Sequence, residues 1–453
     1  MKKEKKYVIL LIYSILGILT VLQAGSQNST DYIVEILDNY YISQGMIPYV
    51  DFFEHHPVFQ NTILSPLFNI PLSLKSILFL YELLAIIGVF FSAYLVFLIA
   101  KKCEFKYPHA ASILFLAGYT GMSISFFRYE YWSMIFLLFF LLFSHPFLKG
   151  LFLGLLIVTS PITLFAALAM GGWYTFRNIL QQKWKELFVI VSGVTTSILF
   201  WRILLYKIPL KLQYEYIFSF NSKVAHLYSL PWKEVLFFTL ILSVPILLAG
   251  AYSSIRLWKT NERAQLATIF TIVFITQIIL MNIVYGFFSR IKLPALIPVL
   301  GILIIFIAWY NSRTILIFVL GYLLFTILAF TPSFSFQKVE MIQTISELNS
   351  CISKDASYLF EEHIPEGITP LPLFRKPLEY YWFVHDLVNS SGREYIPVTI
   401  EHPVHICSNI IDQSMVICSE QEVKRLQQHC NSWKWNDSLW QRLKQFLRSN
   451  NWA

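Results

Sequence analysis

Long apolar stretches alternate with short polar connections along the first 331 residues of the chain. A helix needs about 20 apolar residues to cross roughly 30 Å of hydrocarbon, and most of these stretches approach that length. The pattern therefore predicts an all-α polytopic membrane protein with about 11 transmembrane helices. The predicted spans lie near 7–25, 76–100, 107–126, 132–148, 150–160, 162–176, 187–206, 234–255, 264–285, 293–309 and 314–331.

The spans near 150–160 and 162–176 admit a second interpretation, because both are short and they flank Pro161. One long helix kinked at this proline would reverse the orientation of every later span. It would then export the basic cluster from Arg256 to Arg263, so we favour two separate spans.

The remaining segment, 332–453, has mixed charge, clustered Pro and Gly, and no apolar run long enough to span. It predicts a small C-terminal domain outside the bilayer, which we expect to be α/β. The chain thus divides into a membrane domain, 1–331, whose first outer loop covers 26–75, and a C-terminal domain, 332–453.

Charge sets the orientation of these spans. The chain is 56% hydrophobic and 14% charged, with a net charge of +8. Its basic residues lie mostly in short connections, a distribution typical of cytoplasmic loops and not of a nucleic-acid-binding face. The basic start followed by Tyr7–Gly25 resembles a secretory signal, but it has no convincing cleavage site. We predict a cytoplasmic N-terminus, a periplasmic or extracellular C-terminal domain, and a multi-pass protein of the cell inner membrane.

Cysteine positions agree with this orientation. Cys103 falls in a predicted cytoplasmic loop, whereas the other four cysteines fall in the C-terminal domain. These four cysteines could form two disulfides or remain four free thiols, and the sequence is compatible with both. The four are Cys351, Cys407, Cys418 and Cys430.

The first outer loop concentrates acidic side chains. The segment from Gly25 to Leu74 contains no Lys or Arg but five acids. Residues 31–43 predict an amphipathic helix lying along the membrane interface, with Glu35 and Asn39 on its polar face. Asp31 is either the N-cap of this helix or a functional carboxylate. The acids are Asp31, Glu35, Asp38, Asp51 and Glu54.

Glu54, His55 and His56 are consecutive and, with Asp51, make a candidate site for a divalent metal, because carboxylates and neutral imidazoles suit zinc or manganese. Neighbouring side chains of an extended segment point apart, so we expect at most one of the two histidines at such a site. His226 is a candidate distant ligand and equally a candidate surface residue. A metal-free site remains open.

Several motifs share one pattern. Asp31 leads a predicted helix, which is followed by Gly45-Met-Ile-Pro-Tyr-Val-Asp-Phe-Phe-Glu-His-His-Pro57. Arg128-Tyr-Glu130, Thr159-Ser-Pro161 and Arg290-Ile-Lys-Leu-Pro294 follow downstream. This arrangement resembles the GT-C class of polyprenyl-phosphate-sugar-dependent glycosyltransferases, of the protein mannosyltransferase and aminoarabinose transferase kind.

The resemblance implies an inverting sugar transfer from a polyprenyl phosphate to an extracytoplasmic glycolipid, glycan or protein, with Asp31 as the catalytic base. Tyr49, Asp51 and His56 would belong to a loop that contacts the donor or the acceptor. The leaving phosphate needs cations on the outer side. The candidates are Arg128, Lys207, Lys211, Arg290 and Lys292, although Lys207, Lys211 and Lys223 could instead bind anionic lipid headgroups.

Other functions fit a polytopic chain. A transporter or flippase would show ionisable residues inside its spans or a repeat in two halves, and neither is apparent here. A polymerase or ligase of lipid-linked glycans would carry its key residues in a large late loop. A non-catalytic member of the same fold is a further alternative.

Overall fold

The computed structural model describes most of the first 224 residues and short pieces of the C-terminal region. The described ranges are 9–18, 30–102, 107–122, 129–160 and 164–224, together with the C-terminal strands and a few isolated residues. The predicted spans between 234 and 331 lie outside them.

The chain divides into two compact units. The first contains Met1–Gln27, His56–Ile63 and Leu80–Lys338, and the second contains Asn28–His55, Leu64–Phe79 and Val339–Ala453.

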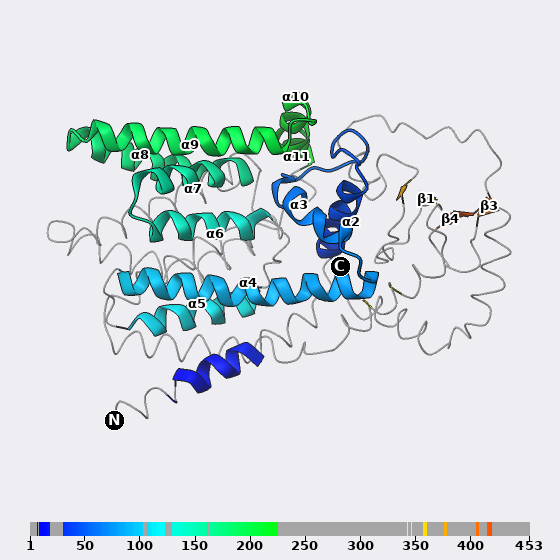
Figure 1. Ribbon diagram of the computed structural model, residues 1–453, viewed down its shortest axis with the longest axis horizontal. Helices are drawn as coiled ribbons and strands as arrows, with labels where there is room; N and C mark the ends of the chain where they lie inside the picture. Colours follow the sequence, from blue (N-terminus) through cyan, green and yellow to red (C-terminus); the bar gives the residue numbers. More distant parts are fainter. Residues whose placement is uncertain are drawn as a thin grey trace. The chain divides into compact units, whose positions relative to one another are not determined.

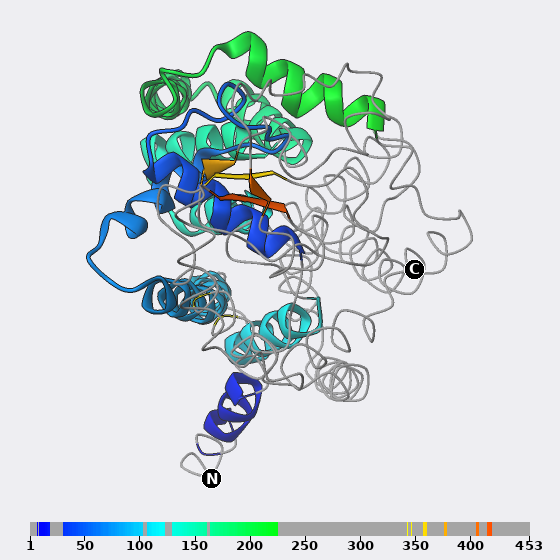
Figure 2. The same cartoon turned by 90° about the vertical axis from the view of Figure 1, so that its right-hand side faces the viewer.

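The helices of the first unit run mainly along one direction (Figure 1). Several of them are seen nearly end on after the 90° turn (Figure 2). After a first helix at Ile9–Ile18, they are α4 (Leu74–Lys102), α5 (Pro108–Met122), α6 (Tyr129–Leu142), α7 (Pro146–Thr159), α8 (Leu164–Leu180) and α9 (Trp184–Leu204). The short α3 (Phe59–Leu64) precedes a 3₁₀ turn at Ser65–Asn69. Beyond α9 one further helical segment contains α10 (Leu210–Tyr214), a π-helical turn (Glu215–Phe220) and α11 (Asn221–Val224).

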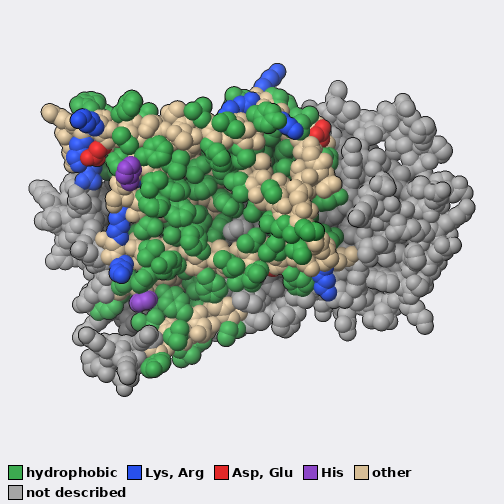
Figure 3. Space-filling view, viewed as in Figure 1, with side chains coloured by type: hydrophobic (Ala, Val, Ile, Leu, Met, Phe, Trp, Pro, Cys, Tyr) green, Lys and Arg blue, Asp and Glu red, His purple; other side chains and the backbone are tan. Residues whose placement is uncertain are grey.

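Within the described ranges, two helices are long and apolar enough to cross a membrane. They are α4, with 29 residues, and α9, with 21 residues. The face in Figure 3 is mainly hydrophobic over the helices of this unit, and its charged side chains gather toward the helix ends. Lys101 and Lys102 form the last turn of α4, for example. The described part of the first unit is thus all-α and contains two helices that could span a membrane, while the count of eleven spans stays a prediction.

Helix boundaries differ most from the predicted spans around Pro146. The expected span 132–148 is wrong, because α6 ends at Leu142 and α7 begins at Pro146. Proline fits the first turn of a helix, where its missing N–H has no intrahelical partner, and His145 before it is extended. By contrast, α4 and α9 agree with the expected spans 76–100 and 187–206 within a few residues.

The structure separates α7 from α8. Ser160 has an extended backbone at the end of α7, so the two are distinct helices and not one long helix kinked at Pro161. At 14 residues, α7 is about 21 Å long, which is short for a full crossing.

Small residues bring α7 and α9 into close contact. A Cβ atom on Gly150 would lie 2.0 Å from the Ile190 carbonyl oxygen, and one on Gly193 would lie 2.3 Å from the Phe147 carbonyl oxygen. Ser197 donates a hydrogen bond from its Oγ to the Leu151 carbonyl oxygen at 2.5 Å. Such direct backbone contact is the packing that small residues allow between membrane helices.

Polar and aromatic contacts join the remaining helices. The Ser92 hydroxyl of α4 lies 3.1 Å from the Tyr131 hydroxyl of α6. Ser112 of α5 donates to the Ala93 carbonyl oxygen at 2.7 Å. Phe139 of α6 stacks on Phe152 of α7, with ring centroids 4.8 Å apart. The hydroxyls are therefore satisfied within the apolar bundle, as burial requires.

The second unit contains α2 (Thr30–Ser43), the loop after it, and a small mixed sheet. The strand order is β2-β1-β4-β3; β1 pairs parallel with β2 and antiparallel with β4, which also pairs antiparallel with β3. The strands are β1 (Ser357–Leu359), β2 (Lys376–Pro377), β3 (His405–Ile406) and β4 (Met415–Cys418). Cys351, Cys407 and Cys430 lie outside the described residues, so the disulfides stay a prediction.

Candidate functional site

Helix α2 carries most of the acids of the first outer loop. It spans Thr30–Ser43, close to the expected range 31–43. It is followed by Gly45, whose φ is +85°, a left-handed conformation that favours glycine. Gly45 N–H donates to the Ile42 carbonyl and Met46 N–H to the Tyr41 carbonyl, at 3.0 and 3.1 Å. The glycine thus turns the chain sharply from the helix into the loop.

Asp31 has a helical backbone one residue after Thr30. It therefore belongs to the helix itself and is not the flanking N-cap residue, although an acid in a first turn still favours the helix dipole. Its register relates it to two other acids, because Glu35 and Asp38 follow it by four and seven positions. Residues at this spacing share one face of an α-helix. We call positions 31, 35 and 38 the acidic face of α2.

The expectation that α2 lies along the membrane interface with a polar face is wrong for its middle. Glu35 and Asn39, expected on the polar face, are 4% and 0% exposed, and Ile36 and Leu37 are equally buried. Aromatic residues of the same unit pack against the C-terminal part of the helix. Tyr40 packs edge-on against Phe68 of the 3₁₀ turn, and Tyr41 packs against Phe52 of the loop, with ring centroids 5.5 and 5.3 Å apart.

Three carboxylates are buried within this unit: Glu35, Asp38 and Glu54. Burial, the negative charge of Glu54, a side-chain interaction with Glu54 and the negative charge of Glu35, in decreasing order, raise the pKa of Asp38 well above its usual range. Neither oxygen of Asp38 meets strict hydrogen-bond geometry with a described group, and the Asn39 amide likewise has no such partner. Asp38 is therefore neutral under conditions where an exposed carboxyl would be ionised.

The loop after Gly45 folds into a tight turn. Tyr49 has a φ of +64°, which is uncommon for a residue with a side chain, and its ring is buried. Tyr49 N–H donates to the Phe52 carbonyl at 3.1 Å, and Ile47 N–H donates to Oδ2 of the exposed Asp51 at 2.6 Å. Asp51 thus closes the turn. A strained backbone held by its surroundings is typical of binding and catalytic loops.

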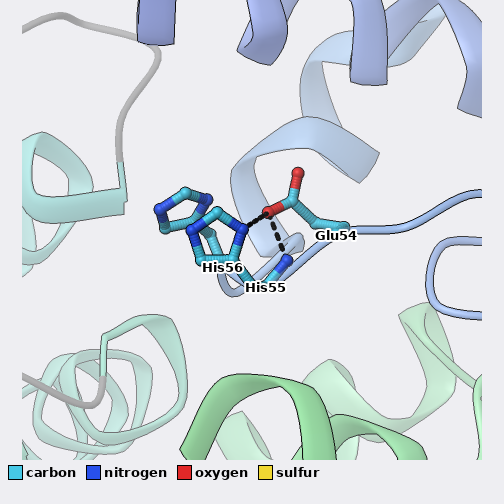
Figure 4. A group of neighbouring side chains, drawn as sticks. All are labelled: Glu54, His55 and His56. Atoms are coloured by element: carbon cyan, nitrogen blue, oxygen red, sulfur yellow. Dashed lines mark hydrogen bonds and ion pairs between the residues drawn. The ribbon is translucent and has the colours of Figure 1, made fainter. Parts of the chain in front are cut away.

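Glu54, His55 and His56 follow this turn and lie together (Figure 4). Oε1 of Glu54 accepts a hydrogen bond from the His55 backbone N–H at 2.7 Å and lies 3.8 Å from His55 Nδ1. His55 stacks on Phe53, and His56 packs against Tyr129. The ligand atoms of all three residues lie within 4.8 Å of one another. Both histidines thus have a ligand atom close to Glu54, although their side chains were expected to point apart.

This group offers a carboxylate oxygen and two imidazole nitrogens, a ligand set that suits zinc. Bonds of about 2.0–2.2 Å would hold tetrahedral ligand atoms roughly 3.5 Å apart, so only small side-chain rotations would gather these atoms around one ion. Because Glu54 also interacts with Asp38, a cation bound here would interact electrostatically with the buried acids as well.

Of the cations predicted to bind the phosphate, two lie among the described residues and three do not. Lys207 and Lys211 are exposed around the start of α10. Arg128, Arg290, Lys292 and the candidate metal ligand His226 lie outside the described residues.

The burial of Glu35, Asp38 and Asn39 does not follow from the sequence pattern. The sequence feature that indicates this cluster of acids is their helical spacing within a segment that contains no Lys or Arg. Comparisons with family models, curated proteins and solved structures found no match.

Proposed function

We propose that this protein is a membrane glycosyltransferase that moves a sugar from a polyprenyl-phosphate donor to an acceptor on the outer side of the cell membrane. The main support for this proposal is the acidic face of α2. It puts Asp31 in register with the buried acids Glu35 and Asp38, beside a strained loop. A segment that is rich in carboxylates and lacks Lys and Arg favours proton acceptance and cation binding over phosphate binding.

In the proposed reaction, Asp31 accepts the proton of an acceptor hydroxyl or amine. The acceptor atom forms a bond to the anomeric carbon while the bond from that carbon to the phosphate oxygen breaks. The phosphate leaves with the electron pair. One displacement of this kind inverts the anomeric centre. Arg128, Arg290 and Lys292 would stabilise the charge that develops on the departing phosphate.

Glu54, His55 and His56, with His226 as a further candidate, would hold a divalent metal. When bound, such an ion supplies positive charge to phosphate oxygens. The turn closed by Asp51 would keep these ligands in place, because it fixes the backbone immediately before them.

Replacement of Asp31 by Asn tests this function. Asn keeps the size of the side chain but accepts no proton at neutral pH, so we expect transfer to fall at least about a hundredfold. Glu186→Gln is the matched control. Glu186 is an exposed acid in the first turn of α9, paired with Lys183 at 3.5 Å, and its loss should leave activity unchanged.

The assay would give purified full-length protein a panel of polyprenyl-phosphate sugars with a glycolipid or peptide acceptor, and would measure the product. Helix content by circular dichroism would confirm that the variants fold. Equal activity in the parent and in Asp31→Asn would remove Asp31 from the mechanism. Donor-independent solute or lipid flux through liposomes, with no transfer from any donor, would favour a transporter or flippase instead.

A further inference from the structure

The helical segment Leu210–Val224 does not continue the direction of α9. Figure 1 shows α9 along its length and the segment nearly end on, and Figure 2 shows the reverse. Because α9 is long and apolar enough to cross a membrane, a segment running across its end would lie along the membrane surface.

Arg202 fixes the turn between the two helices. Its Nη1 donates to the carbonyl oxygens of Leu205 and Ile208 at 3.0 and 2.8 Å, and its Nη2 donates to that of Tyr206 at 3.3 Å. Gln213, which is buried, also donates to the Ile208 carbonyl at 3.3 Å. These bonds tie the carbonyls of the connecting turn, 205–208, to side chains of the two helices, so the change in direction is built into the fold.

The segment has two distinct faces. Residues at positions 213, 216, 217 and 220 are buried, a spacing that marks one side of a helix. On the other side Leu210, Tyr214 and Phe218 are 54%, 66% and 37% exposed, and Tyr206 in the turn is 66% exposed. The rings of Tyr214 and Phe218 stack with centroids 5.7 Å apart, across the start of the π-helical turn. This exposed face is therefore apolar and aromatic.

Exposed cations accompany the apolar face. Lys207, Lys211 and Lys223 are all exposed, and Glu215 is the one acid of this segment. Lys207 lies over the Tyr206 ring, with its Nζ 6.0 Å from the centroid. Aromatic rings combined with lysines are typical of helices that lie between headgroups and acyl chains.

We propose that Leu210–Val224 is a helix that lies on the membrane surface and binds anionic phospholipid. Leu210, Tyr214 and Phe218 insert at the level of the upper acyl chains, and Lys207, Lys211 and Lys223 bind headgroup phosphates. The excess of positive charge selects anionic over zwitterionic lipid. This assigns Lys207 and Lys211 to the bulk lipid and not to the phosphate of the sugar donor.

The test uses the full chain in nanodiscs that contain a photoreactive headgroup analogue of either phosphatidylglycerol or phosphatidylcholine, with peptide mapping of the crosslinks by mass spectrometry. We expect the phosphatidylglycerol probe to label 206–224 preferentially. A lysine near an anionic surface contributes about 1 kcal/mol, or roughly fivefold, so the triple variant Lys207→Gln, Lys211→Gln, Lys223→Gln should lose at least fivefold of that preference.

Two controls separate charge from folding. Replacing the same three lysines by Arg should retain the preference, because the charge remains. Labelling around Lys183 and Lys185, near the start of α9, should be unchanged in the Gln variant and serves as an internal reference.

Three outcomes would overturn the proposal: absence of labelling at 206–224, equal labelling by both probes, or loss of labelling when stoichiometric polyprenyl phosphate is added. The last result would return these lysines to the donor. Because lipid labelling requires no turnover, failure of the proposed glycosyl transfer would leave this test intact.

Discussion

Replacing Gly193 by Ala should strongly destabilise the contact between α7 and α9. The added Cβ would lie 2.3 Å from the Phe147 carbonyl oxygen and 2.7 Å from the Leu151 nitrogen. Both are backbone atoms, so no side chain can rotate away, and the helices would have to separate by about 1 Å to restore ordinary contact. Overpacking of this kind costs roughly 3 kcal/mol or more.

Two smaller effects act on the same variant. Helix separation would also weaken the hydrogen bond from Ser197 to Leu151, which contributes about 1 kcal/mol. Alanine has the higher helix propensity, which returns about 1 kcal/mol. The expected net loss in the free energy of unfolding is therefore about 3 kcal/mol.

Gly172 in α8 provides the matched control, because a Cβ atom there would meet nothing within 4 Å. Gly172→Ala should be neutral or should stabilise the protein by up to about 1 kcal/mol through helix propensity. The same chemical change is thus expected to have opposite signs at the two positions.

Reversible unfolding in mixed micelles of increasing SDS content, followed by circular dichroism, would measure both variants. Gly150→Ala, whose Cβ would lie 2.0 Å from the Ile190 carbonyl oxygen, should be at least as damaging as Gly193→Ala. If Gly193→Ala and Gly150→Ala were as stable as the parent, the close backbone contact between α7 and α9 would be incorrect.

Two further predictions concern the first outer loop. Because the pKa of Asp38 is raised in the folded state, its contribution to stability is complete below the unfolded pKa and is lost as pH rises through the folded value. Unfolding in a chelator-containing buffer should show the parent losing stability with rising pH and Asp38→Asn losing less. Identical profiles would place Asp38 in water. The charges of Glu35 and Glu54 act on the same group. Zinc or manganese titration of the full chain by calorimetry should show at least about tenfold weaker binding in Glu54→Gln than in the parent. The exposed His145→Ala is the control, and no saturable binding in the parent would exclude the metal.

The sequence by itself determined the helices and turns that depend only on neighbouring residues in the chain. Apolar runs longer than 20 residues can hardly avoid helical structure near a bilayer, so α4 and α9 were predictable within a few residues. The glycine at position 45 likewise indicated the end of α2, because only a residue without a Cβ adopts its conformation easily. The concentration of acids in a segment without Lys or Arg is a property of the sequence alone.

Tertiary structure decided which of these acids are in water. The pattern of α2 indicated an interfacial helix, yet Glu35, Asp38 and Asn39 are buried. Phe68 and Phe52, from segments farther along the chain, pack against Tyr40 and Tyr41 of the same helix. Likewise, periodicity placed His55 and His56 apart, whereas the loop brings both toward Glu54. The order of residues in the chain specifies where charges lie and which segments favour helix. The pKa of Asp38 and the composition of a metal-ligand set depend instead on distances between atoms. Only the folded, packed chain determines those distances.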